Sequence, residues 1–166
     1  GYHYPRSKDT AVQSQWGESS FIKEYGEAVV NGDVEHYYCI ASQDSKVTAK
    51  QYVDFLNDVN LYYEEKKLDF LQENVVDLVV KVKEYLFDPK KLKQICWDKL
   101  NKHDVNVILN TEYMDSDYES VVNATYANLN VILPSDKQKK YQFELCEKPV
   151  VKLSKEYKNK SVVVMD

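Results

Sequence analysis

The chain has 166 residues, of which 43% are hydrophobic and 30% charged, and its net charge is −5. This length fits one domain with a sizeable core, and the composition is that of a globular protein rather than of a disordered tail. No apolar run approaches the roughly 18–20 residues of a membrane span, and there is neither an initiating methionine nor a signal-peptide pattern. We therefore expect membrane contact only through a segment outside this sequence, upstream of Gly1.

The charge is unevenly distributed. Between Asp136 and Lys160 eight lysines accompany four acidic residues, a local charge of +4, which leaves −9 for the other residues. This basic end can meet an anionic surface or an acidic partner, although a solvated surface is the simpler interpretation. Arg6 is the single arginine, and arginine is the preferred residue for base-edge and phosphate recognition. We therefore expect no specific nucleic-acid binding.

Three cysteines, Cys39, Cys96 and Cys146, are too few and too scattered for a disulfide framework. Cys96 has leucines four residues away on either side, which indicates a core position on a helix. Free buried thiols are the preferred interpretation, and one disulfide with a remaining thiol is the alternative.

The polar residues 1–17 predict a tether or extended lead-in, with Trp16 as a docking anchor, and residues 18–166 predict one domain. The stretch from Ser20 to Phe55 predicts three helices. The first is capped by Ser19 or Ser20 and ends near Gly32, the second runs from Asp33 to Ala41, and the third follows Thr48. Thr48 and Gln51 have the spacing of a capping box.

The next segment is ambiguous. Residues 64–72 favour a helix by propensity, whereas 75–87 can be helix or strand. A stripe from Leu68 to Tyr85 has helical spacing, but Val76 to Val82 alternates with the period of a strand and is rich in β-branched residues. Asp88 and Pro89 then predict the start of another helix.

After Lys102 the apolar period changes to two. Alternating segments at 105–109, 127–133 and 141–145, with shorter ones at 150–153 and 161–165, predict antiparallel strands separated by turns. Helices followed by strands indicate an α+β fold, with N-terminal helices packed on a curved antiparallel sheet formed by the C-terminal half.

The search for catalytic chemistry assigns no catalytic residue, no cofactor-binding residue and no metal ligand. His3, His36 and His103 are far apart in sequence, and Glu35 and His36 are expected to form a surface pair. Asp115, Asp117 and Glu119 have oxygen ligands at alternate positions, but an acidic turn explains them better than a cation site. Fourteen tyrosines suit core packing, with a pocket or an interface as the alternative.

One stretch carries a family resemblance. Phe21 to Tyr25, the Asn31-Gly32-Asp33 turn, the Tyr37-Tyr38 pair, Lys46 and Gln51 to Phe55 resemble the opening of domains with the nuclear-transport-factor-two-like cone fold. The resemblance implies helices wrapped by long antiparallel strands, and it requires a strand within 75–87. It also implies an extracytoplasmic, membrane-anchored setting, because many such domains are bacterial lipoproteins or assembly factors of type IV secretion channels. Enzymes of this fold place Asp, His or Tyr inside the cone, but no such motif can be matched here.

These observations favour a non-catalytic protein-interaction or assembly module of a membrane-tethered envelope complex of the conjugation or secretion type. Its expected partners are other proteins or further copies of itself, and no cofactor is expected. Two alternatives stay open. One is a small-ligand pocket protein or enzyme of the same fold, which needs a cavity where tyrosine hydroxyls meet a carboxylate of perturbed pKa. The other is an intracellular or viral interaction protein in the cytoplasm, which would explain free cysteines.

Overall fold

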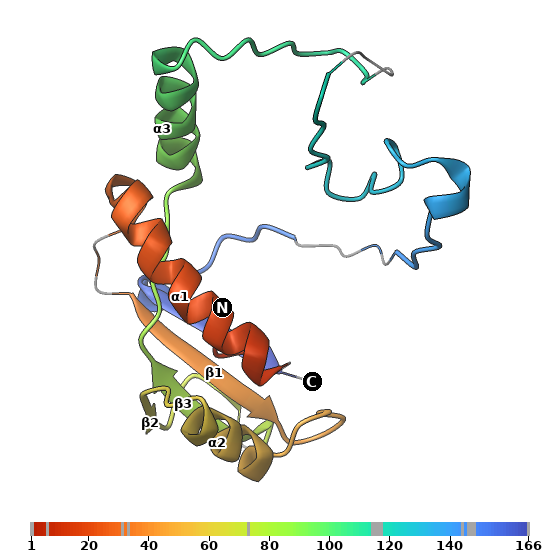
Figure 1. Cartoon of the computed structure of the whole chain (residues 1–166). Coiled ribbons are helices and arrows are strands. Elements are labelled where there is room, and N and C mark those ends of the chain that lie inside the picture. Colours follow the sequence, from red (N-terminus) through yellow and green to blue (C-terminus); the bar gives the residue numbers. More distant parts are fainter. Residues whose placement is uncertain are drawn as a thin grey trace. The chain divides into compact units, whose positions relative to one another are not determined.

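The computed structural model describes residues 2–5, 7–30, 32, 34–72, 74–113, 118–143, 145 and 149–165. The chain divides into two compact units (Figure 1). We call residues 1–105 with 153–166 the sheet unit, and residues 106–152 the inserted unit.

The sheet unit contains all the α-helices and β-strands of the described residues, which confirms the α+β class. The helices and strands are α1 (Lys8–Tyr25), β1 (Glu35–Ala41), α2 (Ala49–Asp58), β2 (Tyr63–Glu65), β3 (Val76–Val82), α3 (Pro89–Lys102) and β4 (Lys160–Met165). Short 3₁₀ turns lie at Gly26–Ala28, Ser135–Lys137 and Lys155–Tyr157. Within the described part of the chain, no helix has the length and apolar character that crossing a bilayer requires.

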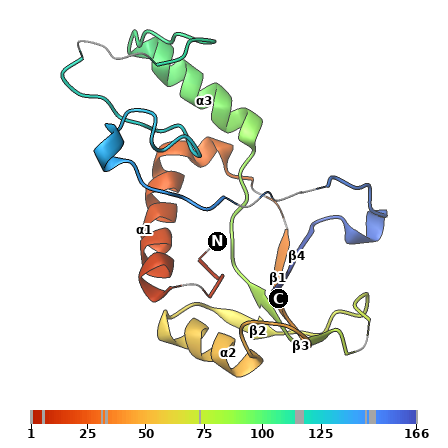
Figure 2. The ribbon, with the colours of Figure 1, turned by 90° about the vertical axis from the view of Figure 1, so that its right-hand side faces the viewer.

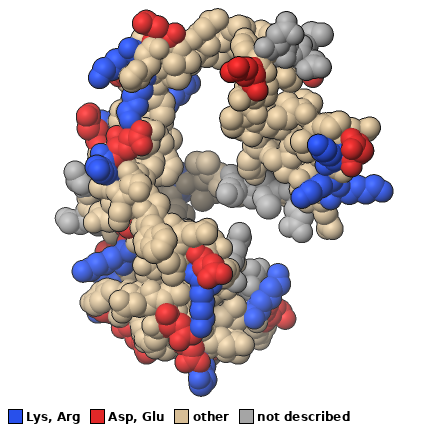
Figure 3. Space-filling view, viewed as in Figure 1, with Lys and Arg blue, Asp and Glu red and all other residues tan. Residues whose placement is uncertain are grey.

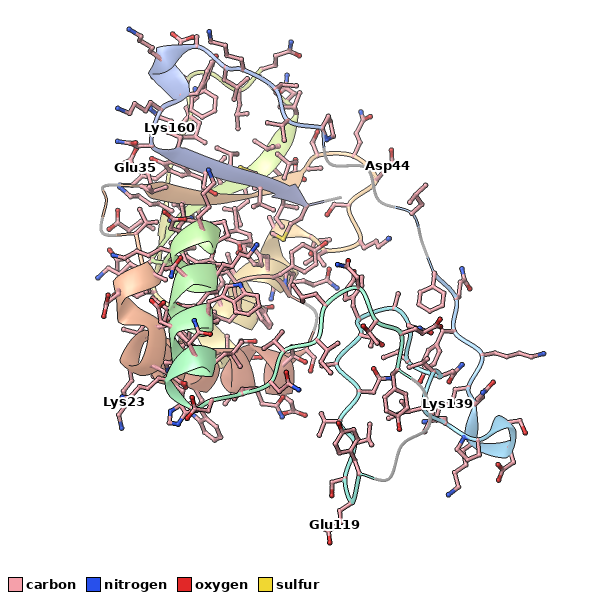
Figure 4. The ribbon with its side chains drawn as sticks, turned by 90° about the horizontal axis from the view of Figure 1, so that it is seen from above. Lys23, Glu35, Asp44, Glu119, Lys139 and Lys160 are labelled. Carbon is pink, nitrogen blue, oxygen red and sulfur yellow. The ribbon has the colours of Figure 1, made fainter. Side chains whose placement is uncertain are left out.

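The strands form one mixed sheet in the order β2-β3-β1-β4. β1 pairs antiparallel with β3 on one side and parallel with β4 on the other. Glu35 at the start of β1 is opposite Lys160 at the start of β4, and Figure 4 shows the two side chains at the same end of the sheet. A hydrogen bond from Lys81, 2.6 Å away, is the main reason that the pKa of Glu35 is lowered, and Lys160 adds to the effect.

Both faces of the sheet are covered, by different elements (Figure 2). On one face α1 and α2 contribute Ala11, Tyr52, Phe55 and Leu56 to a core shared with the strands. On the other face, Leu68 from the loop after β2 packs on Tyr37, Cys39 and Val79. The sheet is therefore the central layer between two helices and a loop.

The first helix begins much earlier than predicted. α1 starts at Lys8, where the Ser7 hydroxyl accepts a hydrogen bond from the Thr10 amide at 3.4 Å, so Ser19 and Ser20 lie within the helix. Much of the predicted lead-in of residues 1–17 is therefore helical. The first half of α1 buries only Ala11, so no apolar stripe marked it in the sequence. None of the described glycines has a positive φ, so Gly32 does not adopt the left-handed conformation expected of it.

The predicted second helix is wrong, because Glu35 to Ala41 is strand β1. β1 lies between β3 and β4 and its five central residues are buried, so it reads as a continuous apolar run rather than as an alternation. The helical spacing of Tyr37, Tyr38 and Ala41 was coincidental. Asn31 and Asp33 of the predicted turn lie outside the described residues.

The ambiguous segment is a strand at β3, as the alternation from Val76 to Val82 predicted. The helix favoured at 64–72 is absent from the described residues of that range, where the short strand β2 is followed by a turn. Extended backbone continues after β3 to Phe87, which makes an isolated bridge with Val29.

Two helices match the sequence closely. α2 has the predicted capping box, because the Thr48 hydroxyl accepts from the Gln51 amide at 3.2 Å and the Gln51 side chain accepts from the Thr48 amide at 2.9 Å. α3 has Pro89 in its first turn and is capped by Asp88, which accepts from the Lys90 and Lys91 amides.

Of the predicted C-terminal strands, only 161–165 is one, as part of β4, and it runs parallel to its neighbour. The described residues of 105–109, 127–133, 141–145 and 150–153 form no strand. Local hydrogen bonds take the place of strand pairing here. The side-chain amide of Asn123 donates to the Asn128 carbonyl at 3.1 Å, and its side-chain oxygen accepts from the Thr125 backbone amide. Asparagine side chains compete with sheet hydrogen bonds in this way.

Candidate functional site

A polar cluster is buried on the helix-covered face of the sheet. His36 and Tyr38 lie two residues apart on β1, so they point to the same face. Glu84 follows β3 and hydrogen-bonds Tyr38: the Tyr38 hydroxyl donates to Glu84 Oε2 at 2.9 Å. We call Tyr2, His3, His36, Tyr38, Tyr52 and Glu84 the polar cluster.

The residues before α1 cover this cluster. The ring of His3 lies between the rings of Tyr2 and Tyr38, with centroids 4.6 and 5.6 Å away, and only 1% of His3 is exposed. His3 Nδ1 is 3.7 Å from Glu84 Oε2, within ion-pair distance but too far for a hydrogen bond. The Tyr2 hydroxyl donates to the Glu18 carboxylate of α1 at 3.1 Å.

The pKa of Glu84 is strongly perturbed. Burial alone would raise it, but His3 and the hydroxyl of Tyr38 stabilise the carboxylate and lower the pKa to about 2. Glu84 is therefore ionised over the whole physiological range. Because its conjugate acid is so strong, it is a poor general base near neutral pH.

Burial favours the neutral forms of three other members, Tyr38, Tyr52 and His36. Burial, followed by the charge of Glu84, raises the pKa of the Tyr38 hydroxyl well above its ordinary value. Burial also raises the pKa of Tyr52, whose hydroxyl has no hydrogen-bond partner among the described residues. Burial lowers the pKa of His36, with a smaller contribution from His3. Neutral donors around one fixed carboxylate can bind a ligand, but they do not form a matched acid and base.

Two cavities adjoin the cluster. One of about 370 Å³ is lined by Glu84, His36, Tyr85, Leu86 and residues 30–34 that are described. The other, of about 390 Å³, is lined in part by Tyr2 and Tyr38. Tyrosine hydroxyls and a carboxylate of perturbed pKa therefore do meet beside cavities.

Few residues of the polar cluster could be predicted from the sequence. Glu35 and His36 are not a surface pair, because His36 faces the core and is buried on β1. His3 fell in the predicted lead-in, and His103 is exposed at the end of α3. One sequence signal points to Glu84. Strand alternation predicts side chains on one face at Val76, Leu78, Val80 and Val82, and Glu84 is the next residue of that series.

The remaining candidate residues that the structure describes are not part of the polar cluster. Asp115 and Asp117 lie outside the described residues, and so does Cys146. Cys39 and Cys96 are free thiols, the first buried and the second half-buried on α3. Burial raises the pKa of Cys39 to about 11. Among the described residues, no group of three or more His, Cys, Asp and Glu side chains is placed to hold a metal ion.

The inserted unit presents a surface of a different kind. None of its described residues is buried, although many are large and apolar. The exposed ones are Val107, Ile108, Leu109, Tyr113, Tyr118, Val121, Val122, Tyr126, Leu129, Val131, Tyr141, Phe143, Leu145, Val150 and Val151. In Figure 3, most of the visible face of this unit carries neither basic nor acidic side chains. Exposed apolar side chains in this number are unusual for a protein surface that meets only water.

Comparison of the chain with family models, with curated proteins and with solved structures gives no match.

Two buried tyrosines should respond oppositely to loss of the hydroxyl. Tyr38→Phe removes a hydrogen bond to a carboxylate, so we expect the free energy of unfolding to fall by about 1–3 kcal/mol. Tyr52→Phe removes a buried hydroxyl without a described partner, so stability should stay within about 0.5 kcal/mol or rise. Urea denaturation of the two variants measures both changes. Equal losses would contradict this arrangement.

Acid should destabilise the fold through Glu84. Its pKa is about 2 when folded and 4.5 as the ordinary value, so its contribution is complete above pH 4.5 and is lost as the pH falls toward 2. Ionised Glu84 contributes up to about 3 kcal/mol to the free energy of unfolding, since one pKa unit corresponds to about 1.4 kcal/mol. Unfolding between pH 6 and pH 2 should therefore show a shallower acid slope for Glu84→Gln than for the wild type. Parallel profiles would rule out a lowered pKa at Glu84.

Proposed function

We propose that the chain is a non-catalytic protein-interaction or assembly module. The observation that carries this proposal is the exposed apolar surface of the inserted unit. Its sequence alternates with the period of a strand, yet its described residues are neither paired in a sheet nor buried. Such a segment gains hydrophobic free energy only by covering its apolar side chains, and a protein partner supplies that cover. Ordering on binding is typical of assembly factors and regulatory segments.

The resemblance to nuclear-transport-factor-two-like domains suggests the setting, a membrane-tethered envelope complex of the conjugation or secretion type. Support is divided. β3 supplies the strand that this resemblance requires, whereas β1 occupies the place of the second helix in the pattern. The free thiols suit the alternative setting, an intracellular or viral interaction protein. Since Cys39 is buried and its pKa is raised, its thiol is unreactive and is compatible with either compartment.

Site-specific photo-crosslinking in the native host tests the interaction. A photoreactive residue at Val122, which is 89% exposed in the inserted unit, should give a discrete crosslinked protein product. The same residue at Lys50, exposed on α2, is the control and should give at least about fivefold less of that product. Equal, diffuse labelling from both positions would contradict a specific interaction surface on the inserted unit.

A second function, binding of a small organic cation, is favoured by the cavity beside Glu84. The carboxylate lines a space of about 370 Å³ together with the Tyr85 ring and the Leu86 side chain. An ionised carboxylate with an aromatic neighbour is the combination that recognises an ammonium group. This function is compatible with the first, because the cavity and the inserted unit use different residues.

Titration with n-butylammonium, followed by amide NMR shifts, tests this second function. Shifts should concentrate at Val34, His36 and Leu86, and Glu84→Gln should weaken binding by about tenfold or more, because it removes the charge but keeps the shape. n-Butanol, a neutral molecule of similar size and shape, is the control ligand and should cause no such shifts. Equal affinity of wild type and variant for n-butylammonium would remove Glu84 from the site.

A further inference from the structure

The two edges of the sheet differ in how they are protected. β2 forms one edge and is only three residues long, and it carries Glu64 in an ion pair with Lys66. β4 forms the other edge with six residues. Short length and charge are the usual protections of an edge strand. The β2 edge has both of them.

The β4 edge has neither protection beyond Lys160 at its first position. Val162, Val163 and Val164 follow in succession, with no proline and no bulge in the pairing with β1. Val164 is 50% exposed, on the same side of the strand as Val162. Among the described residues, no strand pairs with the outer side of β4. This edge can therefore accept another strand through its backbone groups.

The chain does not reach β4 as a hairpin along that edge. The turn before β4 is held by the loop after β2, where the Tyr157 ring meets Phe70 edge-on with centroids 5.4 Å apart. The Asn159 carbonyl then accepts a hydrogen bond from the Glu35 amide at 2.9 Å, which joins the turn to β1. Neither contact pairs a backbone group of the connection with β4, so among the described residues β4 stays an edge strand.

The inserted unit contains a segment suited to such an edge. The Asn130 side chain donates to the Lys139 carbonyl at 2.8 Å and accepts from the Lys139 amide at 3.1 Å, which imitates one strand pairing. The two arms around the turn at Pro134 are thus held together. On the second arm the rings of Tyr141 and Phe143 lie 6.1 Å apart, as expected for side chains two positions apart on extended backbone. Both rings are exposed.

We propose that the chain self-associates: residues 138–143 of one copy add as a strand to the open β4 edge of a second copy. This inference rests on the interaction function proposed above and identifies its partner. Aromatic and β-branched side chains on adjacent strands form favourable cross-strand pairs, so Tyr141 and Phe143 suit Val162 and Val164. Each copy carries one edge and one segment. A reciprocal exchange between two copies satisfies both edges and both segments, and it closes as a two-fold dimer.

Sedimentation equilibrium of the full chain tests this dimer. We expect a concentration-dependent monomer–dimer equilibrium. Val164→Lys places a charge on the edge at a half-exposed site and should raise the dissociation constant about tenfold or more. Phe143→Ser, which alters an exposed ring, should have a similar effect. Two variants are controls: Val164→Thr retains a β-branched residue, and Tyr126→Ser alters a ring that is 95% exposed outside the segment. Both should stay within about threefold of the wild type.

Hydrogen exchange at several protein concentrations gives a second readout that does not depend on the variants folding. Amides of β4 and of 138–143 should become protected together as dimer forms. Protection at all concentrations in a monomer would mean that the segment pairs within its own chain, which would overturn the proposal. A dimer insensitive to Val164→Lys and Phe143→Ser would also overturn it.

Failure of the self-association can be distinguished from failure of the interaction function. A chain that stays monomeric, while Val122 crosslinks to another protein in the host, loses the β4 dimer but keeps the interaction function. A monomeric chain with no specific crosslink loses both.

Discussion

Burial of β1 on both faces and pairing on both sides is the constraint from which the rest of the sheet unit follows. Tyr38 and Ile40 face the helices, whereas Tyr37 and Cys39 face the loop after β2, so a single strand contributes to both cores. In the sheet, β3 and β4 each pair with β1 and not with one another. A polar substitution on either face of this strand would therefore leave an unsatisfied group in a core and weaken two strand pairings at once.

The sequence predicts some elements of the sheet unit correctly and others wrongly, for physical reasons. Thr48 and Asp88 carry their helix signals locally, in side chains that bond to neighbouring amides, so the starts of α2 and α3 could be predicted. β1 has no such signal, because a strand buried on both faces loses its alternation. The inserted unit shows the reverse: alternation is present, but a strand also needs a partner with which to exchange hydrogen bonds. Of the polar cluster, only Glu84 could have been placed from the sequence, by continuing the alternation of β3. His3 is brought to the cluster by tertiary packing, and no local sequence pattern predicts that.

The polar cluster and the inserted unit divide the chemistry of the molecule. In the cluster, Glu84 is a fixed charge that accepts a hydrogen bond from the Tyr38 hydroxyl. In the inserted unit, many apolar side chains are exposed among the described residues, and asparagine side chains make local hydrogen bonds to the backbone. The two regions therefore differ in how far the described part of the chain covers their side chains. The interaction function proposed above rests on that difference.

The parallel pairing of β4 with β1 has a consequence for biosynthesis. A ribosome must release the whole inserted unit before β4 can reach its place beside β1. Until then one side of β1 is without its strand partner, along the apolar run from Tyr37 to Ile40. Closing so long a loop adds little to the equilibrium cost but slows the search for the native pairing. The sheet is therefore completed late, and the interval before completion is when a chaperone, or another nascent chain, can compete for the same strand.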